Sequence, residues 1–326
     1  MALSITDHPM PISRDESYAW CQSLAKRTAR NFYYSFLTLP AEQYRAMCAL
    51  YAFMRITDDW SDDERLLLDE KREGLVQWRN NFLGELARRE SRETIHASRV
   101  AEQHPVLPAI CDVVLRYRLR VEHLTAVIDG VERDLTHTGY DTFADLEEYC
   151  RLVAGVIGLC CLPIWGCERP EAEAPALSCG LAFQLTNILR DLGEDVERGR
   201  CYLPREDLQR FGYTPPMLAA REYNAAFKEL MAFEIDRARA HYREAERLNA
   251  WLNSGGKAVF QTMFRVYSGL LDEIERREYD VFTSRVSLPS WKKYLWVTQS
   301  LITHRLFARR ARVESPESRV QSQKEE

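Results

Sequence analysis

The chain has 326 residues, of which 46% are hydrophobic and 29% are charged, a composition that allows a large core and a solvated surface. Its net charge of −5 argues against a nucleic-acid-binding protein, because such proteins usually carry a basic stripe. Nine cysteines without a C-x-x-C pair predict reduced, buried thiols in a cytoplasmic protein. The first 13 residues lack the apolar core of a signal peptide, and no run of about 18 apolar residues predicts a membrane span.

Helical patterns follow one another along the chain. A capping box that joins Ser13 to Glu16 predicts the start of the first helix, and Pro40 predicts the start of the next. Apolar periodicity predicts further helices over residues 75–86, 110–135, 146–165, 175–195, 223–251 and 257–279, with Thr142 as a cap and residues 253–256 as a stop signal. Gly155 and Gly158 indicate either close helix packing or room for a ligand.

The absence of convincing period-2 strands and of internal repeats favours an all-α fold. We expect one helical bundle over residues 14–312. A flexible segment, residues 1–13, precedes it, and a polar, disordered tail, residues 313–326, follows it.

The first acidic cluster spans residues 58–63, at the end of the helix that begins after Pro40. Asp58 and Asp62 are four residues apart and therefore share a helical face, on which Tyr51 and Arg55 also lie. Carboxylates this close raise one another's pKa, a penalty that a cation removes. Magnesium prefers one or two carboxylates completed by water and phosphate. The alternative is an acidic, solvated helix end, which the helix macrodipole disfavours.

A second polar row consists of Gln184, Asn187, Asp191 and Asp195, spaced by three, four and four residues on a helix that begins with apolar residues. A polar stripe on an apolar helix must face polar groups, because burying it unpaired is costly. Two such rows facing each other would hold several metal ions, and the arginines that flank the second row suit phosphate oxygens. The alternative is a surface helix with salt bridges.

These segments resemble the squalene/phytoene synthase family, and the resemblance covers about residues 27–300. Residues 187–204 resemble its second aspartate-rich signature, 149–158 its central signature and 51–63 its first aspartate-rich motif. The resemblance implies an isoprenoid synthase bundle around a central active-site cavity. It also implies head-to-head (1′-1) joining of two identical prenyl diphosphates through a cyclopropylcarbinyl diphosphate.

The resemblance also implies roles for individual residues. Tyr149 matches a proposed proton acceptor, and Arg30 and Gln184 are suited to further diphosphate contacts. The cofactor implied is Mg²⁺, with Mn²⁺ as the alternative ion. Use of NADPH stays open, because no G-x-G-x-x-G fingerprint is present and this fold need not use one. The positions matching metal–diphosphate ligands are Asp58, Asp62, Asn187, Asp191 and Asp195, and those matching diphosphate contacts are Arg55, Arg190, Arg200, Arg285, Tyr51 and Tyr267.

The substrate has two alternatives. The doubled acids Asp62 and Asp63 favour two farnesyl diphosphates, giving presqualene diphosphate or a squalene-type product. Residues 271–282 are equally similar to bacterial phytoene synthases, which join two geranylgeranyl diphosphates. Head-to-tail elongation does not fit the second acidic row, and a terpene cyclase would lack the Tyr149 segment. A hypothesis of another class is an inactive family member that acts as an assembly factor, which would have lost the acids.

We expect the prenyl diphosphate substrates and downstream isoprenoid enzymes as partners. A basic, aromatic stretch begins at residues 291–297 and continues to Arg312. Such composition is typical of interfacial helices, so it predicts peripheral contact of a cytoplasmic protein with a membrane. The alternative is a C-terminal helix packed on the bundle, whose basic end complements the helix dipole.

Overall fold

The computed structural model describes residues 12–29, 32–91, 104–136 and 139–300. Within these ranges every regular element is a helix, which confirms the predicted all-α fold. The predicted tail, Arg30 and nearly all of the predicted N-terminal segment lie outside the described residues. Among the helices that are described, none is long and apolar enough to cross a bilayer.

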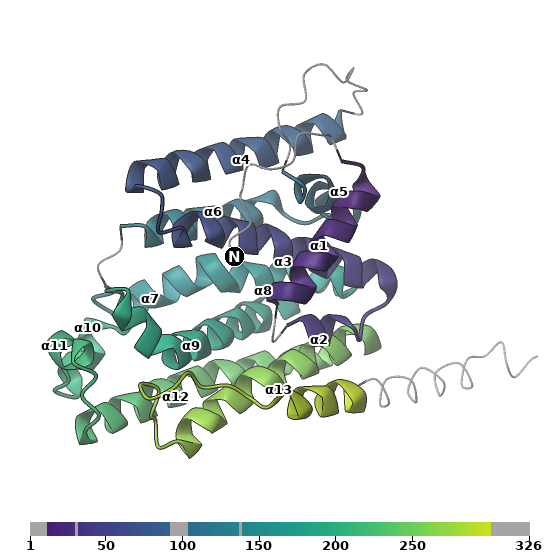
Figure 1. Ribbon diagram of the computed structural model, residues 1–326. Helices are drawn as coiled ribbons and strands as arrows, with labels where there is room; N and C mark the ends of the chain where they lie inside the picture. The colour runs from purple at the N-terminus through teal and green to yellow at the C-terminus, as the bar shows by residue number, and fades with distance from the viewer. Residues whose placement is uncertain (1–11, 30–31, 92–103, 137–138, 301–326) are drawn as a thin grey trace, which may run out of the picture.

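The helices in chain order are α1 Arg14–Thr28, α2 Tyr33–Phe36, α3 Ala41–Asp62, α4 Leu68–Glu90, α5 Leu107–Tyr117, α6 Val121–Asp134, α7 Phe143–Cys150, α8 Val156–Ile164, α9 Glu173–Glu197, α10 Arg205–Arg210, α11 Pro215–Ala219, α12 Ala225–Ala245 and α13 Ser254–Arg276 (Figure 1). A π-helical turn, η2 Arg151–Gly155, joins α7 to α8, and two 3₁₀ turns are η3 Pro170–Ala172 and η4 Glu246–Ala250. Residues 290–300 form a further helical stretch after α13.

Helix starts follow the signals in the sequence. The Ser13 hydroxyl accepts the Glu16 N–H, and the Glu16 carboxylate accepts the Ser13 N–H, so the predicted capping box opens α1. Thr142 caps α7 in the same way, and the Asn253 side chain accepts the Gly256 N–H at the start of α13. Each cap satisfies N–H groups that a helix start leaves unpaired, which contributes about 1 kcal/mol.

Two predicted helices are interrupted in the structure. The pattern over residues 110–135 is divided into α5 and α6, because Arg118 adopts a left-handed conformation (φ 50°) that ends α5. The pattern over residues 146–165 includes the π turn η2 between α7 and α8. Hydrophobic spacing alone does not reveal either interruption, since the apolar residues on both sides keep a near-helical period.

The helix α9 lies near the centre of the bundle, where it packs against α8, η2, α12 and α13 (Figure 1). On the other side, α3 packs against α1, α4, α5 and α6. The two helices that carry the acidic rows therefore belong to the interior of one bundle. Their positions are fixed by packing on several neighbours each.

Glycines allow the close crossing of α9 with η2 and α8. A Cβ atom on Gly158 would lie 2.3 Å from the Ala176 carbonyl oxygen, and one on Gly180 would lie 2.4 Å from the Ala154 carbonyl oxygen. Real Cβ atoms do not approach backbone this closely, so only glycine fits at these two positions. A Cβ on Gly155 would meet the Leu177 and Leu181 side chains at 3.2 and 3.3 Å. Of the two interpretations of Gly155 and Gly158, the structure supports close helix packing.

Candidate active site

The acidic row on α3 occupies the last turns of that helix. Asp58 is half-buried, and Asp62 lies one turn further along the same face. Burial, followed by repulsion from Asp62, raises the pKa of Asp58 to about 7. Arg55 forms an ion pair of 2.5 Å with Asp59 rather than with Asp58. Asp58 thus has no ion pair of its own within the described residues, and a bound cation would stabilise its ionised form.

The acidic row on α9 holds one compensated and one uncompensated carboxylate. Arg190 Nε donates to Asp191 Oδ1 at 2.7 Å, and Arg285 Nε donates to the same oxygen at 2.9 Å. Although burial opposes ionisation, these arginines lower the pKa of Asp191. Asp195 forms no ion pair with another described side chain, and burial followed by repulsion from Asp191 raises its pKa to about 7. Each row therefore contains one acid that has no ion-pair partner in the described part of the chain.

Asn187, on the same row of α9, has a side-chain oxygen to which no described residue donates a hydrogen bond. Its Nδ2 donates a long hydrogen bond of 3.4 Å to Gln184 Oε1. Its Oδ1 is buried and accepts no hydrogen bond from the part of the chain that the structure describes. A buried oxygen without a donor costs free energy, so it indicates a missing donor or cation.

Asp134, the last residue of α6, lies between the two acidic rows. Its negative charge contributes to the raised pKa of both Asp58 and Asp195. Arg200 Nη1 lies 3.5 Å from Asp62 Oδ1 and 4.0 Å from Asp134 Oδ2, and the Tyr202 hydroxyl donates to Asp134 Oδ2 at 2.8 Å. Burial raises the pKa of Asp134 as well. The Arg200 guanidinium thus links the end of α3 to the end of α6.

Tyr149, on α7, belongs to a cluster of three tyrosine rings. Its ring stacks on that of Tyr202, with the ring centroids 5.7 Å apart. The centroid of the Tyr140 ring lies 5.5 Å from that of Tyr149. Burial, followed by the charge of Asp134, raises the pKa of Tyr149 well above its ordinary value. Tyr149 is therefore a neutral phenol, close to Asp134 and beside the apolar interior.

Tyr51 and Tyr267 approach the site from α3 and α13. The Tyr51 hydroxyl donates to Thr28 Oγ1 at 3.1 Å, and the Tyr267 ring stacks between Phe32 (5.1 Å) and Phe183 (4.4 Å). Tyr267 also lies close enough to Arg190 to interact with it electrostatically. Both predicted tyrosines thus lie beside residues of the acidic rows.

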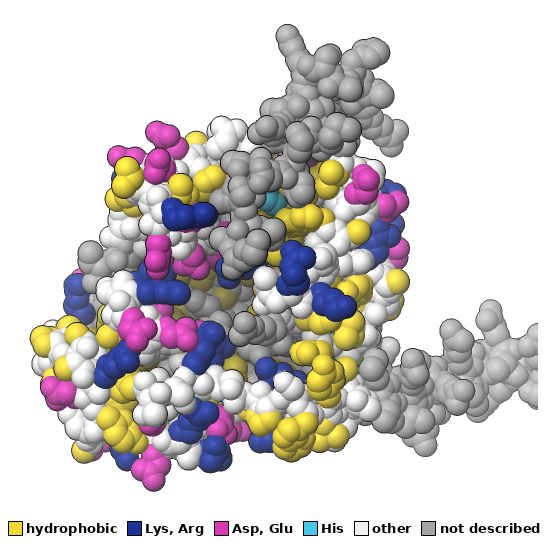
Figure 2. Space-filling model, in the orientation of Figure 1, with side chains coloured by type: hydrophobic (Ala, Val, Ile, Leu, Met, Phe, Trp, Pro, Cys, Tyr) yellow, Lys and Arg dark blue, Asp and Glu magenta, His cyan; other side chains and the backbone are white. Residues whose placement is uncertain are grey.

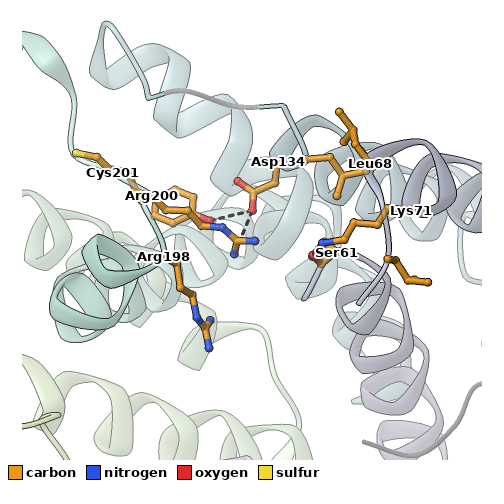
Figure 3. Close-up of a pocket in the computed structure, with 11 residues that line it drawn as sticks. Ser61, Leu68, Lys71, Asp134, Arg198, Arg200 and Cys201 are labelled. Carbon is orange, nitrogen blue, oxygen red and sulfur yellow. Dashed lines mark hydrogen bonds and ion pairs between the residues drawn. The ribbon is translucent and has the colours of Figure 1, made fainter. Parts of the chain in front are cut away.

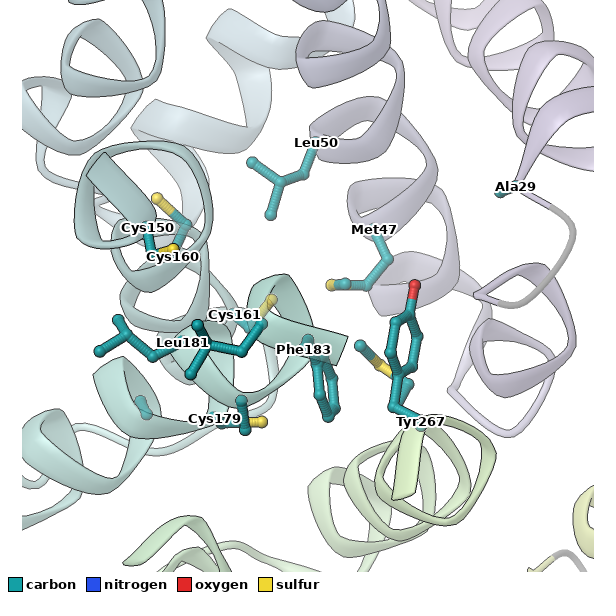
Figure 4. Close-up of a cluster of buried hydrophobic side chains, with 14 of the residues drawn as sticks. Ala29, Met47, Leu50, Cys150, Cys160, Cys161, Cys179, Leu181, Phe183 and Tyr267 are labelled. Atoms are coloured by element: carbon teal, nitrogen blue, oxygen red, sulfur yellow. The ribbon is translucent and has the colours of Figure 1, made fainter. Parts of the chain in front are cut away.

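An apolar wall continues inward from Tyr267. Figure 4 shows Met47 and Leu50 from α3 facing Cys161 from α8 and Phe183 from α9. The nine cysteines form no disulfide, and all but Cys201 are buried, as predicted. Several of them lie among these apolar side chains (Figure 4). The site therefore has a charged mouth and an apolar interior.

The charged mouth opens into a cavity of about 350 Å³ (Figure 3). Its lining comes from the end of α3, the start of α4, the end of α6 and the loop after α9, and it includes Lys71, Asp134, Arg200 and Tyr202. Figure 2 shows basic and acidic side chains mixed on the left part of the face that is in view.

The sequence analysis missed Asp134, Tyr202 and Lys71. The sequence does contain a pattern that points to Asp134. Leu124, Val127 and Val131 form the buried face of α6, and Asp134 follows Val131 three residues later on that face. No sequence pattern points to Tyr202 or Lys71, because their positions in the cavity lining depend on how a loop and the start of a helix pack in three dimensions. Among the predicted site residues, the structure brings together those on α3 and α9 with Arg200 and Arg285, whereas Tyr149 meets them only through Asp134.

The donors fit a divalent cation that is bound together with a ligand. Within the described residues, no three carboxylate, histidine or cysteine side chains are gathered closely enough to hold a metal ion unaided. Among the residues that the structure describes, Asp58 and Asp195 nevertheless form no ion pair and the buried Asn187 Oδ1 accepts no hydrogen bond, and all three are oxygen ligands of the kind that Mg²⁺ takes. Mg²⁺ usually keeps a few protein carboxylates and completes its shell with water and phosphate oxygens. The arrangement thus suits a phosphorylated ligand carrying an apolar chain.

Comparisons with known proteins agree with this geometry. The chain is 36% identical to a phytoene synthase of Arthrospira platensis, over 87% of this chain and 92% of that protein. It is 35% identical to a 15-cis-phytoene synthase of Synechocystis sp., over 87% of this chain and 84% of that protein. Among solved structures, a dehydrosqualene synthase in complex with a ligand superposes with a TM-score of 0.77 at 28% identity, covering 88% of this chain and 96% of that one.

A squalene synthase from Alicyclobacillus acidocaldarius superposes with a TM-score of 0.72 at 26% identity, covering 83% of this chain and 97% of that one. The family model described as squalene/phytoene synthase matches residues 25–292. That range contains both acidic rows, Tyr149 and every arginine that contacts the rows. With the fold, the paired rows and these relatives in agreement, the chain belongs to the squalene/phytoene synthase family.

Proposed function

We propose that the protein joins two geranylgeranyl diphosphates head-to-head to give a phytoene-type hydrocarbon. The observation that carries the condensation is the pair of acidic rows on α3 and α9, which flank Asp134 and Arg200 beside an apolar interior. The twenty-carbon chain length is supported by the names of relatives at 34 to 36% identity, which are phytoene synthases. These relatives favour this substrate over the farnesyl diphosphate expected from Asp62 and Asp63.

The fifteen-carbon reaction is the second candidate. It is supported by two solved structures, a dehydrosqualene synthase and a squalene synthase, which match the fold at 28% and 26% identity. Both candidates begin with the same condensation and differ in the length of the apolar pocket that they need. The choice between them is a question of substrate preference.

The arginines and carboxylates would bind the two diphosphates. Arg190 and Arg285 hold Asp191 ionised, and Arg55 and Arg200 add positive charge beside Asp58 and Asp62. Asp58, Asp62, Asn187, Asp191 and Asp195 would hold the divalent metal on which the family generally depends, Mg²⁺ being our proposal for this chain. The metal would neutralise charge that develops on the leaving diphosphate.

Tyr149 would act on the proton that cyclopropane formation releases. Its raised pKa makes it a phenol rather than a phenolate, so it accepts a proton only while it gives its own away. Asp134, whose pKa burial also raises, is the nearby carboxylate able to hold that proton. The apolar side chains around Phe183 would keep water from the allylic cation.

Product analysis tests the proposal. The protein is incubated with farnesyl and with geranylgeranyl diphosphate, separately and in competition, with Mg²⁺ or with excess chelator, and with or without NADPH. We expect a forty-carbon product from geranylgeranyl diphosphate, with Mg²⁺ and without NADPH. A preference for farnesyl diphosphate would assign the squalene-type reaction, and no turnover of either would favour the inactive assembly factor.

We also propose that the protein contacts membranes peripherally through residues 290–300 and α2. One face of this helical stretch packs on α13: Val297 is buried, and Ser300 Oγ accepts from Thr262 Oγ1 at 2.9 Å. The other face exposes Trp291 (62%), Tyr294 (53%) and Leu295 (46%). Within residues 290–300, packing on the bundle therefore accounts for only one face, and the rest of the predicted stretch, residues 301–312, lies outside the described residues.

The exposed face continues onto α2. The Tyr34 and Tyr294 hydroxyls lie 3.1 Å apart, and Leu37, three residues after Tyr34, is exposed. Figure 2 shows hydrophobic side chains gathered at the lower right of that face, over α2 and residues 290–300. Phe32, just before α2, stacks on Tyr267, so this surface lies next to the entrance of the apolar interior. Aromatic and basic side chains together favour the interfacial region of a bilayer.

A further inference from the structure

The cavity beside the acidic rows has more positive charge than its carboxylate balances. Lys71, Arg198 and Arg200 line it together with a single acid, Asp134. Asp134 is already engaged, since Tyr202 donates to it at 2.8 Å and Arg200 lies 4.0 Å away. Within the described part of the chain, no carboxylate lies at ion-pair distance from Lys71 or Arg198. Within the described residues, Lys71 and Arg198 therefore form no ion pair, although their charges act on the nearby Asp63 and Asp195.

Lys71 has an unusual position for a cation. It lies near the start of α4, where the helix macrodipole favours negative charge. It is half-buried, and its Nζ donates to the Ser61 carbonyl oxygen at 2.7 Å, a neutral acceptor that uses one of its three N–H groups. Figure 3 shows Lys71 and Arg200 projecting toward each other from opposite walls of the cavity. Like charges that face each other across open space indicate a place for an anion.

The reaction supplies such an anion. In the first step of the proposed condensation a C–O bond of one substrate breaks, new C–C bonds join it to the other substrate, and one diphosphate and one proton leave. In the second step the remaining C–O bond breaks, and a second diphosphate and a second proton leave. Both diphosphates are polyanions, and the apolar interior offers them no route. They must depart through the charged mouth.

We propose that the Lys71–Arg198–Arg200 cavity binds the inorganic diphosphate released by the reaction, separately from the metal-binding rows. The cavity opens next to Asp62, to which Arg200 is bound at 3.5 Å, so a diphosphate leaving the rows meets it directly. Its volume of about 350 Å³ lies at the lower end of the range for small-molecule sites. Inorganic diphosphate bound in this cavity would inhibit the enzyme that released it. The inference rests on the proposed condensation.

Calorimetric titration with inorganic diphosphate tests the site directly. The full chain is titrated in excess chelator, so that no metal can bridge diphosphate to the aspartates. We expect binding to the wild type and at least tenfold weaker binding to Lys71→Gln. Lys71→Arg, which keeps the charge, should bind nearly as well as the wild type. A melting curve for each variant confirms that the fold is retained.

The matched control is Arg72→Gln. Arg72 is the next residue of α4 and carries the same charge, but it does not line the cavity. Equal weakening by Arg72→Gln and Lys71→Gln would assign the effect to general electrostatics and overturn the proposal. So would the absence of binding to the wild type, or unchanged binding to Lys71→Gln. Because the titration uses no prenyl substrate, its outcome does not depend on whether the condensation occurs.

Inhibition kinetics give a second readout. Added inorganic diphosphate should inhibit the wild type more strongly than Lys71→Gln, and the inhibition constant should rise more than the KM for the prenyl diphosphate. A KM that rises as much as the inhibition constant would show that Lys71 serves the substrate itself, contrary to the proposal. If no condensation product forms at all, the proposed function fails, and the calorimetric result still decides whether the cavity binds diphosphate.

Discussion

Asp58 makes the metal-free protein less stable as the pH rises. Its carboxyl ionises near pH 4 in the unfolded chain and near pH 7 in the folded protein. Between these values the folded state holds a proton that the unfolded state has lost, so the contribution of Asp58 to stability is greatest below pH 4 and falls as the pH rises through 7.

We predict that Asp58→Asn removes this pH dependence while it abolishes activity. In chelator at pH 8 the Asn variant should melt a few degrees above the wild type, because the buried charge is gone. Turnover with Mg²⁺ should fall by orders of magnitude. Melting curves at pH 5 and pH 8 and a product assay measure both effects. Wild-type activity in excess chelator, or in the Asn variant, would contradict the metal-binding role.

Tyr149 allows a separate test of the first half-reaction. The Tyr149→Phe variant keeps the ring that stacks on Tyr202 and loses only the hydroxyl. We predict near-normal substrate binding and a large fall in the rate of cyclopropyl intermediate formation, measured by single-turnover product analysis. A wild-type rate would assign the base elsewhere, with the released diphosphate as the remaining candidate.

At the residue scale, the sequence predicted the two acidic rows but not every side chain that the structure places beside them. The acids on α3 and α9 were predictable because their spacing places them on helical faces that need no tertiary information. Asp134 interrupts an apolar stripe and was detectable in principle. Lys71 and Tyr202 were not, because neither lies in a periodic pattern that distinguishes it from an ordinary surface or core residue.

At the scale of elements, the crossing of η2 with α9 depends on Gly180. We predict that Gly180→Ala lowers stability by about 1–3 kcal/mol, because its Cβ would lie 2.4 Å from the Ala154 carbonyl oxygen and the helices must separate. Gly84→Ala is the matched control, since a Cβ there meets no atom within 4 Å in the middle of α4. That control should be neutral or gain up to about 1 kcal/mol. Denaturant unfolding compares the two, and equal effects would refute the close-contact explanation.

A buried charge cluster joins α10 to α12. Arg237 donates to Asp207 at 2.7 Å and to Glu234 at 2.8 Å, and both acids are almost completely buried. We predict that Arg237→Met costs about 3–5 kcal/mol, because it leaves two carboxylates in the interior without a cation. Arg239→Met, on the same helix, removes only partly exposed ion pairs with Asp272 and Glu275 and should cost about 1 kcal/mol or less. Chemical denaturation measures both, and similar losses would contradict the argument.

Elements were predictable where local signals act alone. The starts of α1, α7 and α13 follow from side chains that cap their own helix. The division at Arg118 was not predictable, because arginine has no preference for the left-handed conformation that it adopts there. The short helices α2, α10 and α11 contain too few turns for a periodic pattern, so only their packing on the bundle identifies them.

At the scale of the whole molecule, the proposed membrane contact is the exposed aromatic face over α2 and residues 290–300. We predict that the full chain floats with anionic vesicles at low salt, and that Trp291→Glu combined with Tyr294→Glu abolishes flotation by adding negative charge to the contact. Val76→Glu, at an equally exposed apolar position on α4, is the control and should float like the wild type. Equal flotation of all three would exclude this surface as the membrane contact.

The π-helical turn η2 has a consequence for insertions and deletions in this chain. A π turn contains one residue more than the α-helical path it replaces, and such turns occur frequently at functional sites. Deleting one residue within Arg151–Gly155 would let α7 and α8 merge into a regular α-helix. Because the deleted residue is the one by which the π turn exceeds the α-helical path, α7 and α8 would keep nearly the same relative rotation, and Tyr149 would still stack on Tyr202. Deleting one residue within α7 or α8 would instead rotate the two parts of that helix by about 100° relative to each other. Residues 151–155 are thus the place along α7 and α8 where the chain could lose one residue without turning Tyr149 away from its neighbours.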